Sequence, residues 1–530
     1  MVTLRAEVES WTQASCKAKC IDFDSPLAGE EWISGPAVTM RHLRLYAETL
    51  EGSHPLAGLN AAGDGVVQVF PGARFDSLLL SGFRAEAHRA PGAKFSQQAV
   101  ENPQQLGPGG VAAVLGAGNI NSIPPLDALD LLLRKNLVPV VKLNPVNEYL
   151  LPIFERAFAP LVDRGYLFFQ SGGAAAGSEL LNHDLVDHVH LTGSEQTYDA
   201  IVWGGEPQEQ AAAKAANQRK LNKPVTAELG AVTPVLVVPG PWSRNDLQFQ
   251  ARHLAGMLAH NGSFNCNAPK LLVMASRWHL KESFLRHLRK ALGEIAPRKA
   301  WYPGAAERWE EFARRYPQAE TFGIGSEAKS ISDFKGSISH PANDPEGPLA
   351  LPWLFIPGVP LEANEYACQT EAFCGVLAQT FVDAREPEEF LEQAVPLVND
   401  RVRGSLSCVI ISPDHVSRIA LKKAAAQLRY GGVAVNAWGG MLFGLAQPTW
   451  GAFPGHSDKD IQSGAGEVHN AFLLDGVEKT VLWAPFRPLI KPLYFPNHRR
   501  SAAVGKAWVD FELHPGLFSL MRIAIPALFP

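Results

Sequence analysis

An alternation of short apolar strands and helical patterns, beginning near residue 111, constrains the fold more than any other feature. The runs "VAAVL" (111–115), "VPVVK" (138–142) and "YLFF" (166–169) are apolar and have the length of strands. The segments "PPLDALDLLLRKN" (124–136) and "YLLPIFERAFAPLVDRG" (149–165) separate them and have helical periodicity. Strands that alternate with helices at this spacing predict a parallel sheet with right-handed crossovers.

A second series of the same kind begins near residue 228. Its predicted strands are "PVLVV" (234–238), "LLVMA" (271–275), "SCVIIS" (407–412) and "GGVAVN" (431–436). Helical patterns such as "NDLQFQARHLAGMLAHNG" follow these strands, so the chain is predicted to contain two doubly wound α/β units. Residues 299–365 are rich in Pro, Gly and aromatic residues and are predicted to be irregular, and the tail from about 484 does not continue the alternation.

Composition excludes several classes of protein. A chain of 530 residues is too long for one core, and a formal charge of −5 without a basic stripe gives no sign of nucleic-acid binding. Six cysteines in this length do not predict a disulfide framework, and "CKAKC" (16–20) lacks two further ligands for a zinc site. The sequence contains no run of about 18 apolar residues, the length that a membrane-spanning helix requires, so no membrane span is expected. The first residues do not resemble a signal peptide, so we expect a cytoplasmic protein.

One cysteine stands in an unusual place. In "AHNGSFNCNAPK" (259–270), Cys266 lies in a polar loop between a helical pattern and an apolar strand. Structural cysteines usually lie among aliphatic residues, whereas loops at the ends of regular elements often carry catalytic groups. Cys266 is therefore a candidate nucleophile, with an inert thiol as the alternative.

Two glycine-containing segments are candidate binding elements. The segment "SGGAAAGSELL" (171–181) follows a strand and opens a helix, where glycines permit a backbone to approach a phosphate. A tight turn without a ligand explains it equally well. The segment "LTGS" (191–194) ends the next predicted strand, at the sheet edge where cofactors bind in such folds. His188 and His190 alternate on that strand, but no third ligand accompanies them to suggest a metal site.

The order of several motifs resembles the aldehyde dehydrogenase superfamily over about residues 70–485. Asn119 in "LGAGNINSIPP" precedes Lys142 by 23 residues, and "LTGS" follows. Glu228 in "TAELG" precedes Cys266 by 38 residues, and "QTEAFCGVLA" (369–378) comes later. The cysteine loop, "FCGV" and the long segment between "LTGS" and "TAELG" depart from the usual family pattern and indicate a divergent branch.

This resemblance implies catalytic roles for three residues. Cys266 would attack an aldehyde as a thiolate, and a thiohemiacetal and then a thioester would form on its sulfur. Glu228 would activate the thiol or the water that releases the acid. Asn119 would donate its amide N–H to the negative charge that develops on the carbonyl oxygen.

The resemblance also implies NAD or NADP as the cofactor. Lys142 would bind the adenosine ribose, and Glu371 and Phe373 would hold the nicotinamide ribose and ring. Further cofactor contacts are expected from Gly172, Gly173, Gly177, Thr192, Gly193 and Ser194. Pro145 stands where many NAD-preferring members have an acid, so a 2′-phosphate meets no repulsion there and NADP is expected to be accepted.

The expected architecture is an aldehyde dehydrogenase-like α/β fold. Residues 1–228 would form N-terminal helices and a Rossmann-like cofactor domain, and residues 229–445 the catalytic domain with Cys266. Residues 446–485 would return to the cofactor domain and form an oligomerisation arm, and residues 486–530 a C-terminal extension. A homodimer or homotetramer is implied by the arm near 470–485.

Alternatives remain open at this stage. A relative that transfers the acyl group to CoA is one alternative, and an acyl reductase that runs from an activated acyl group to the aldehyde belongs with it. Such relatives usually lack the "ELG" glutamate, so Glu228 favours hydrolysis by water. A catalytically silent binding or structural protein would need no combination of Cys266, Glu228 and Asn119. The apolar tail "HPGLFSLMRIAIPALFP" (514–530) is expected to pack on its own chain or on a sister subunit. A sharper hypothesis is that the tail caps a partner's aldehyde tunnel or touches a membrane surface.

Overall fold

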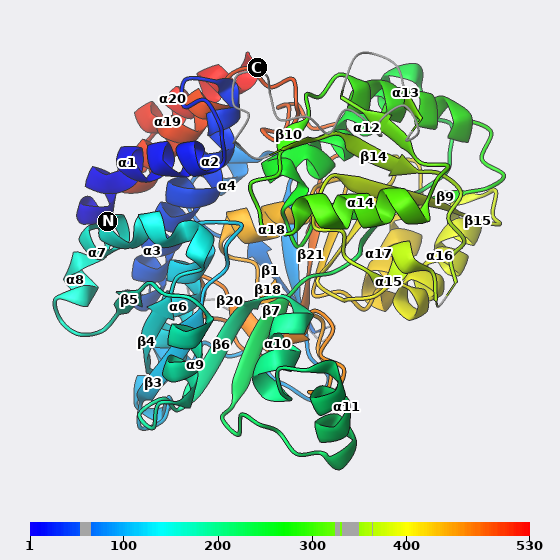
Figure 1. The fold of residues 1–530 in the computed structure, drawn as a ribbon. Helices are drawn as coiled ribbons and strands as arrows, with labels where there is room; N and C mark the ends of the chain where they lie inside the picture. The colour runs from blue at the N-terminus through cyan, green and yellow to red at the C-terminus, as the bar shows by residue number, and fades with distance from the viewer. Residues whose placement is uncertain (53–64, 324–328, 331–348, 363, 530) are drawn as a thin grey trace.

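The computed structural model describes residues 1–52, 65–323, 329–330, 349–362 and 364–529. Within these ranges the chain forms two α/β units, each built on a sheet whose strands are mainly parallel (Figure 1). Both series of predicted strands are present, so the predicted fold class is confirmed.

The smaller sheet contains the first series of predicted strands. Its order among the described residues is β19-β7-β6-β3-β4-β5, and all its neighbours are parallel except β19 and β7. The strands are β3 (Gly110–Leu115), β4 (Leu137–Lys142), β5 (Phe168–Gln170), β6 (His188–Gly193), β7 (Val225–Leu229) and β19 (Gly464–Ala465). The helices between them are α6 (Ile123–Lys135), α7 (Leu151–Ala157), α8 (Ala159–Val162), α9 (Ala174–Asn182), α10 (Glu195–Val202) and α11 (Pro207–Ala216). The carboxyl ends of β4, β6 and β7 therefore lie at one edge of this sheet.

The larger sheet contains the second series. Its described order is β1-β2-β21-β17-β16-β8-β9-β15-β14-β11-β12. The strands at its two ends are β1 (Val66–Phe70), β2 (Arg84–Arg89), β11 (Glu320–Phe322) and β12 (Lys329–Ser330). The central parallel strands are β21 (Val477–Trp483), β17 (Gly432–Val435), β16 (Ser407–Ile411), β8 (Thr233–Val237), β9 (Pro269–Ala275), β15 (Val376–Val382) and β14 (Trp353–Ile356). Every residue of β8, β9, β16 and β17 is buried, as expected for parallel strands that are covered on both faces.

Helices cover both faces of the larger sheet. They include α12 (Arg244–Ala259), α13 (Lys281–Gly293), α14 (Ala305–Arg315), α15 (Tyr366–Gln369), α16 (Pro387–Arg401), α17 (Arg418–Gln427) and α18 (Gly440–Leu445). The helix α12 begins with a capping box in which Ser243 and Asp246 bond each other's backbone N–H groups. It ends immediately before the loop that carries Cys266, so the cap and the packing of α12 set the position of that loop.

The prediction of irregular structure for residues 299–365 is wrong in its described part. This part contains α14, β11 (Glu320–Phe322) and β14. Ala305, Trp309, Phe312 and Ala313 form the buried face of α14 and follow helical spacing. The prediction gave weight to the Pro and Gly content and overlooked this periodicity. Residues 324–328, 331–348 and 363 of the same stretch lie outside the described residues.

After strand β7 the chain leaves the smaller sheet at Leu229 and returns to the larger sheet at Thr233, next to the expected boundary at residue 228. The strands β1 (Val66–Phe70) and β2 (Arg84–Arg89) precede that boundary but lie in the larger sheet. Strand β21, expected in an arm, lies between β2 and β17 of its own chain. The domain boundaries and the oligomeric state stay predictions.

Helices from the two ends of the chain lie together at the upper left of Figure 1. The N-terminal helices are α1 (Val2–Ala18), α2 (Gly29–Trp32) and α3 (Val38–Leu50), and the C-terminal helices are α19 (Ser501–Leu513) and α20 (Leu517–Leu528). α19 contacts α2, α3 and α20. None of the described helices combines the length and the apolar character that crossing a bilayer requires.

The apolar tail packs on its own chain through one face of α20. Leu520, Ile523 and Ala527 are buried in a cluster with residues of α19, including Phe511. The opposite face is exposed and contains Leu517, Phe518, Met521, Ile525 and Leu528. The hypotheses of a partner's tunnel or a membrane surface concern this second face and stay predictions.

A matched pair of substitutions tests which face of α20 supports the fold. Ile523 is 6% exposed and Ile525 is 51% exposed. We expect Ile523→Ala to lower the free energy of unfolding by about 2–4 kcal/mol, because it leaves a cavity against α19. Ile525→Ala is expected to change it by less than about 0.5 kcal/mol. Denaturant unfolding measures both values, and equal losses would contradict this packing.

Candidate active site

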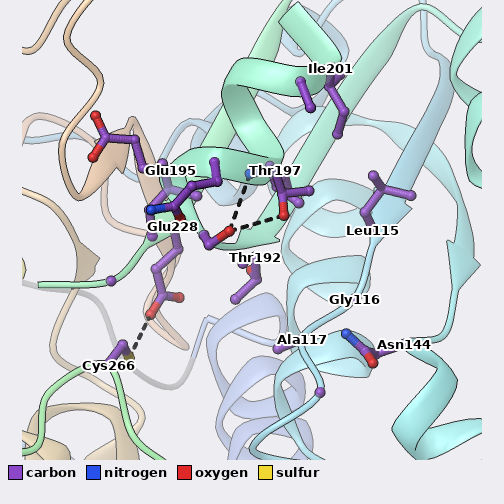
Figure 2. A pocket seen from close by; sticks show the side chains of 18 of the residues that line it. Leu115, Gly116, Ala117, Asn144, Thr192, Glu195, Thr197, Ile201, Glu228 and Cys266 are labelled. Atoms are coloured by element: carbon purple, nitrogen blue, oxygen red, sulfur yellow. Dashed lines mark hydrogen bonds between the residues drawn. The ribbon is translucent and has the colours of Figure 1, made fainter. Parts of the chain in front are cut away.

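A cavity of about 1040 Å³ lies between the two α/β units and brings most of the predicted site residues together. Figure 2 shows part of its lining, with Thr192, Glu228 and Cys266 among the labelled residues. The residues that line it include Asn119, Lys142, Gly177, Thr192, Gly193, Ser194, Glu228, Cys266, Glu371 and Phe373. Gly172 and Gly173 are not among the lining residues. The cavity therefore joins the carboxyl edge of the smaller sheet to the cysteine loop of the larger unit.

The cysteine loop reverses direction directly after α12. Three consecutive residues, Asn261, Gly262 and Ser263, have left-handed backbone with φ of 54°, 65° and 69°. This conformation is unfavourable for serine and persists only where surrounding contacts hold it. The Nζ of Lys270 supplies such contacts, since it donates to the Ser263 hydroxyl at 2.7 Å and to the Ser263 and Cys374 carbonyls at 3.2 and 2.9 Å. The buried ammonium of Lys270 thus fixes the loop that carries Cys266.

The thiol of Cys266 faces the carboxylate of Glu228, as Figure 2 shows. Its Sγ donates to Glu228 Oε1 at 3.5 Å, and Glu228 is 1% exposed. Burial, and then the nearby Asp127, raise the pKa of Glu228 to about 7, although a hydrogen bond from Trp450 opposes this shift. Burial, and then Glu228, raise the pKa of the Cys266 thiol well above its usual value. Near neutral pH the pair is therefore a protonated thiol beside a carboxylate that can accept its proton.

A polar network lies behind Glu228 on the same face of β6 and β7. Thr192 donates its hydroxyl to Asp127 Oδ2 at 2.9 Å, so this hydroxyl is turned away from the cavity. His190 Nδ1 and His188 Nε2 lie 2.9 and 3.0 Å from the Thr226 hydroxyl. The two histidines thus share a hydroxyl, and no group of three or more His, Cys, Asp or Glu in the described part of the chain is arranged to hold a metal ion.

Asn119 lies at the cavity wall directly before α6. Its side-chain Nδ2 donates to the Phe264 carbonyl at 2.9 Å, two residues before Cys266. A primary amide has two N–H groups, so this bond orients the side chain and leaves a second donor. The segment of Asn119 and the cysteine loop are thereby joined at the cavity.

Lys142 ends β4 with its ammonium at the cavity. The structure records no hydrogen bond or ion pair of this side chain to any described residue, and burial lowers its pKa while Glu148 opposes the shift. Glu148 Oε1 accepts a hydrogen bond from the Gly172 N–H at 2.7 Å. The backbone at Gly172 is therefore bonded to an acidic side chain. Pro145 lines the cavity itself.

Glu371 lies against the backbone of the "ELG" segment. It accepts a hydrogen bond from the Ala231 N–H, and its Oε1 is buried without a hydrogen-bond partner among the described residues. Burial raises its pKa to about 7, and the nearby Lys270 opposes this shift. A Cβ on Gly230 would lie 1.8 Å from Glu371 Oε2, so only glycine leaves room for the carboxylate.

Phe373 has left-handed backbone with φ of 43°, and its ring lies 5.0 Å from that of Tyr302 in an edge contact. Arg308 of α14 donates to the Ala372 carbonyl at 2.9 Å and to the Phe373 carbonyl at 3.4 Å. This arginine, which also lines the cavity, therefore holds the strained loop by two backbone carbonyls.

Sequence reasoning missed several residues that shape the site. Trp450 and Asp127 act on Glu228, Arg308 holds the Phe373 loop, and Lys270 holds the cysteine loop. The helical periodicity of α14 was a usable signal for Arg308. Asp127 also had a sequence signal, since it and Asp130 are two acids within the largely apolar helical run 124–133. We find no local signal for Trp450 or Lys270, because their partners are distant in the chain.

Known proteins resemble this chain in structure rather than in sequence. No protein-family model and no curated protein sequence matches it. AldH from Staphylococcus aureus, solved in a substrate-bound state, has a TM-score of 0.57 and 15% identity over 91% of this chain and 87% of its own. An indole-3-acetaldehyde dehydrogenase in complex with NAD⁺ has a TM-score of 0.52 and 18% identity over 90% of this chain and 87% of its own. An NAD-dependent aldehyde dehydrogenase from Sinorhizobium meliloti has a TM-score of 0.51 and 16% identity over 92% and 87%. These similarities show that the chain has the aldehyde dehydrogenase fold.

The pKa of Glu228 predicts how the reactivity of Cys266 depends on pH. Below about 7 this carboxyl is protonated and cannot accept the thiol proton, so alkylation of Cys266 should accelerate as the pH rises through about 7. In Glu228→Gln this inflection should disappear. Peptide-resolved mass spectrometry after timed exposure to iodoacetamide measures the rate, with the exposed Cys20 as internal reference. The same pH profile in both proteins would show that Glu228 does not control the thiol.

Proposed function

We propose that this chain, which has the aldehyde dehydrogenase fold, oxidises an aldehyde to a carboxylic acid with NAD or NADP as the hydride acceptor. The observation that supports this most is the thiol of Cys266 facing the buried carboxylate of Glu228 at 3.5 Å in a large cavity. A reactive cysteine requires a base or a lowered pKa, and here the neighbouring carboxylate is the available base.

The cavity fits a nicotinamide dinucleotide. Its volume of about 1040 Å³ suits a large ligand, and Lys142 directs an ammonium without a described partner into it. Glu371 Oε1 is a buried acceptor without a described partner, which suits a ribose hydroxyl. The indole-3-acetaldehyde dehydrogenase of the same fold was solved with NAD⁺. When bound, the cofactor supplies an acceptor for the hydride of the aldehyde carbon.

The residues of the chain then have distinct roles. Glu228 accepts the proton of Cys266 as the sulfur bonds to the aldehyde carbon, and Asn119 donates an N–H to the oxygen that becomes negative. Loss of the hydride leaves a thioester on Cys266. Glu228, after releasing its first proton, accepts a proton from water as the water oxygen attacks the thioester carbon. The carbon–sulfur bond breaks, the acid leaves, and Cys266 regains a proton.

Glu228 also favours water over CoA as the acyl acceptor. A carboxylate with a pKa of about 7 beside the sulfur is suited to activate water, and this work is unnecessary when a thiol such as CoA attacks. A silent binding protein would not need a thiol, a base and an amide around one cavity.

Two features near Lys142 act in opposite directions on a 2′-phosphate. Pro145 at the cavity wall carries no charge and does not repel one, which favours NADP. Glu148, bonded to the Gly172 N–H, places a negative charge close enough to affect the pKa of Lys142. We therefore propose NAD or NADP without assigning one of them exclusively.

Substitution of Glu228 separates the two halves of the proposed reaction. Glu228→Gln keeps the shape and removes the base, so steady-state turnover should fall by about 10²- to 10⁴-fold. A burst of NAD(P)H followed by a stall would identify hydrolysis as the impaired step. Absorbance at 340 nm with a panel of aldehydes, with and without CoA, measures this.

Two cysteine variants are controls for this experiment. Cys266→Ala should abolish turnover, whereas Cys20→Ala, which changes an exposed thiol, should retain it. Unchanged turnover in Glu228→Gln would contradict the role of the glutamate and favour a CoA-dependent reaction.

The "ELG" glycine provides a separate test of the cofactor site. In Gly230→Ala the new methyl group must displace the Glu371 carboxylate, so the Kd for NAD or NADP should rise at least about tenfold, or about 1.4 kcal/mol. Gly205 also lines the cavity, but a Cβ there would meet nothing within 4 Å, so Gly205→Ala is the matched control. Fluorescence titration with each cofactor measures Kd. Equal affinities in the two variants would exclude Glu371 from cofactor binding.

A further inference from the structure

The lysine within "CKAKC" reaches the active site from the N-terminal helices. Lys19 follows α1 directly, and its side chain is 1% exposed. Its Nζ donates to Glu31 Oε1 at 2.8 Å, to the Asn119 carbonyl at 3.0 Å and to Asn261 Oδ1 at 3.1 Å. An ammonium has three N–H groups, so each one has a partner. The motif therefore places a buried cation beside the proposed catalytic amide.

The contacts of Lys19 continue into a closed ring of hydrogen bonds. Asn261 Nδ2 donates to the Asn119 carbonyl at 3.1 Å and to the Phe264 carbonyl at 3.2 Å. The Phe264 carbonyl also accepts from Asn119 Nδ2 at 2.9 Å. Lys19, Asn119, Phe264 and Asn261 thus join the segment before α6 to the loop of Cys266, and Lys19 is the only charged member of this ring.

A second acid of α2 strengthens the attachment of the cysteine loop. Glu30 Oε2 accepts from the backbone N–H of Asn261 at 3.1 Å and forms an ion pair with Arg298 at 2.9 Å. The adjacent Glu31 neutralises Lys19. Glu30 therefore holds the left-handed turn at Asn261 directly, and Glu31 holds it through Lys19.

We propose that Lys19 is a positioning residue that fixes the Asn119 amide relative to the Cys266 sulfur. This inference rests on the proposed function, in which Asn119 donates to the oxygen of the reacting aldehyde. Stabilisation of a developing negative charge requires a donor that is already in place, because movement of the donor during the reaction costs free energy. Lys19 acts through the backbone carbonyl of Asn119 and is not itself one of the residues that line the cavity.

A buried charge suits this task better than a neutral group. One ammonium donates to a carboxylate, a backbone carbonyl and a side-chain amide at once, and hydrogen bonds from a charged donor are stronger than neutral ones. The ring of Trp301 lies 4.9 Å from the Nζ and offers its face to the cation. Replacement of Lys19 by a residue of similar length without charge removes all three bonds together.

Hydrogen exchange tests the positioning without any need for activity. In Lys19→Met, amide exchange of residues 117–122 and 260–267 should accelerate by roughly tenfold to a hundredfold, because a bond from a charged group is lost on each segment. Arg41→Met is the matched control. Arg41 is equally buried and is paired with Asp76 and Glu512, so its loss should leave exchange of those two segments unchanged.

The loss of one partner from a buried ion pair can also unfold a protein. The variant Lys19→Met/Glu31→Gln removes both charges and keeps the volume, so it provides a folded form in which the same exchange is measured. Unchanged exchange of both segments in this folded variant would overturn the proposal.

A double-mutant cycle tests whether Lys19 acts through Asn119. In the charge-free variant Lys19→Met/Glu31→Gln, kcat should fall by at least about tenfold while the Kd for NAD or NADP stays the same. In an Asn119→Ala background the same change should cause no further loss of kcat, because the group that it positions is absent. If the loss of kcat in the combined variant equals the product of the two separate losses, Lys19 does not act through Asn119.

The two measurements separate this inference from the proposed function. If the unmodified protein oxidises no aldehyde but exchange changes as expected, the proposed function fails and the attachment by Lys19 stands. If it oxidises aldehydes but exchange and kcat are insensitive to the charge-free variant, the function stands and the role of Lys19 is refuted.

Discussion

The burial of a carboxylate against a thiol is the interaction on which the site depends. Glu228 lies at the end of a parallel strand, beneath a cavity rather than in open solvent, so its ionised form has lost most of its hydration. The same burial opposes the ionisation of Cys266, and each group therefore controls the proton of the other. A carboxylate in this state is a much stronger base than a solvated one, and the cysteine loop brings the thiol of Cys266 to it.

This pairing requires a rigid loop, and two buried lysines supply the rigidity by bonds to different residues of the turn. Lys270 holds the left-handed turn to the segment of Cys374, and Lys19 holds it to Asn119 through Asn261. Both cations use backbone carbonyls as acceptors, so they constrain the course of the chain rather than one rotamer. The N-terminal helices, which are distant from the cofactor strands in sequence, thereby become part of the framework of the site.

Periodicity and motif order predicted much of this structure. The strands from "VAAVL" to "GGVAVN" were predictable because parallel strands covered on both faces are short, apolar and separated by helices. The order of Asn119, Glu228 and Cys266 predicted residues that the fold brings to one cavity. The helix α14 was missed because Pro and Gly content outweighed its periodicity. The role of Lys19 could not be predicted, because its partners lie 100 and 242 residues away and no local pattern encodes such contacts.

The central claim is that Cys266 carries the acyl group between oxidation and hydrolysis. Rapid mixing of the protein with an aldehyde and NAD⁺ or NADP⁺, acid quenching within the first turnover, and peptide mapping by mass spectrometry test it directly. The account predicts one added mass, equal to the acyl group less the hydrogen it replaces, on the peptide that contains Cys266 and on no other cysteine peptide. Formation of NADH or NADPH without an adduct on Cys266, or with an adduct on a different residue, would contradict it.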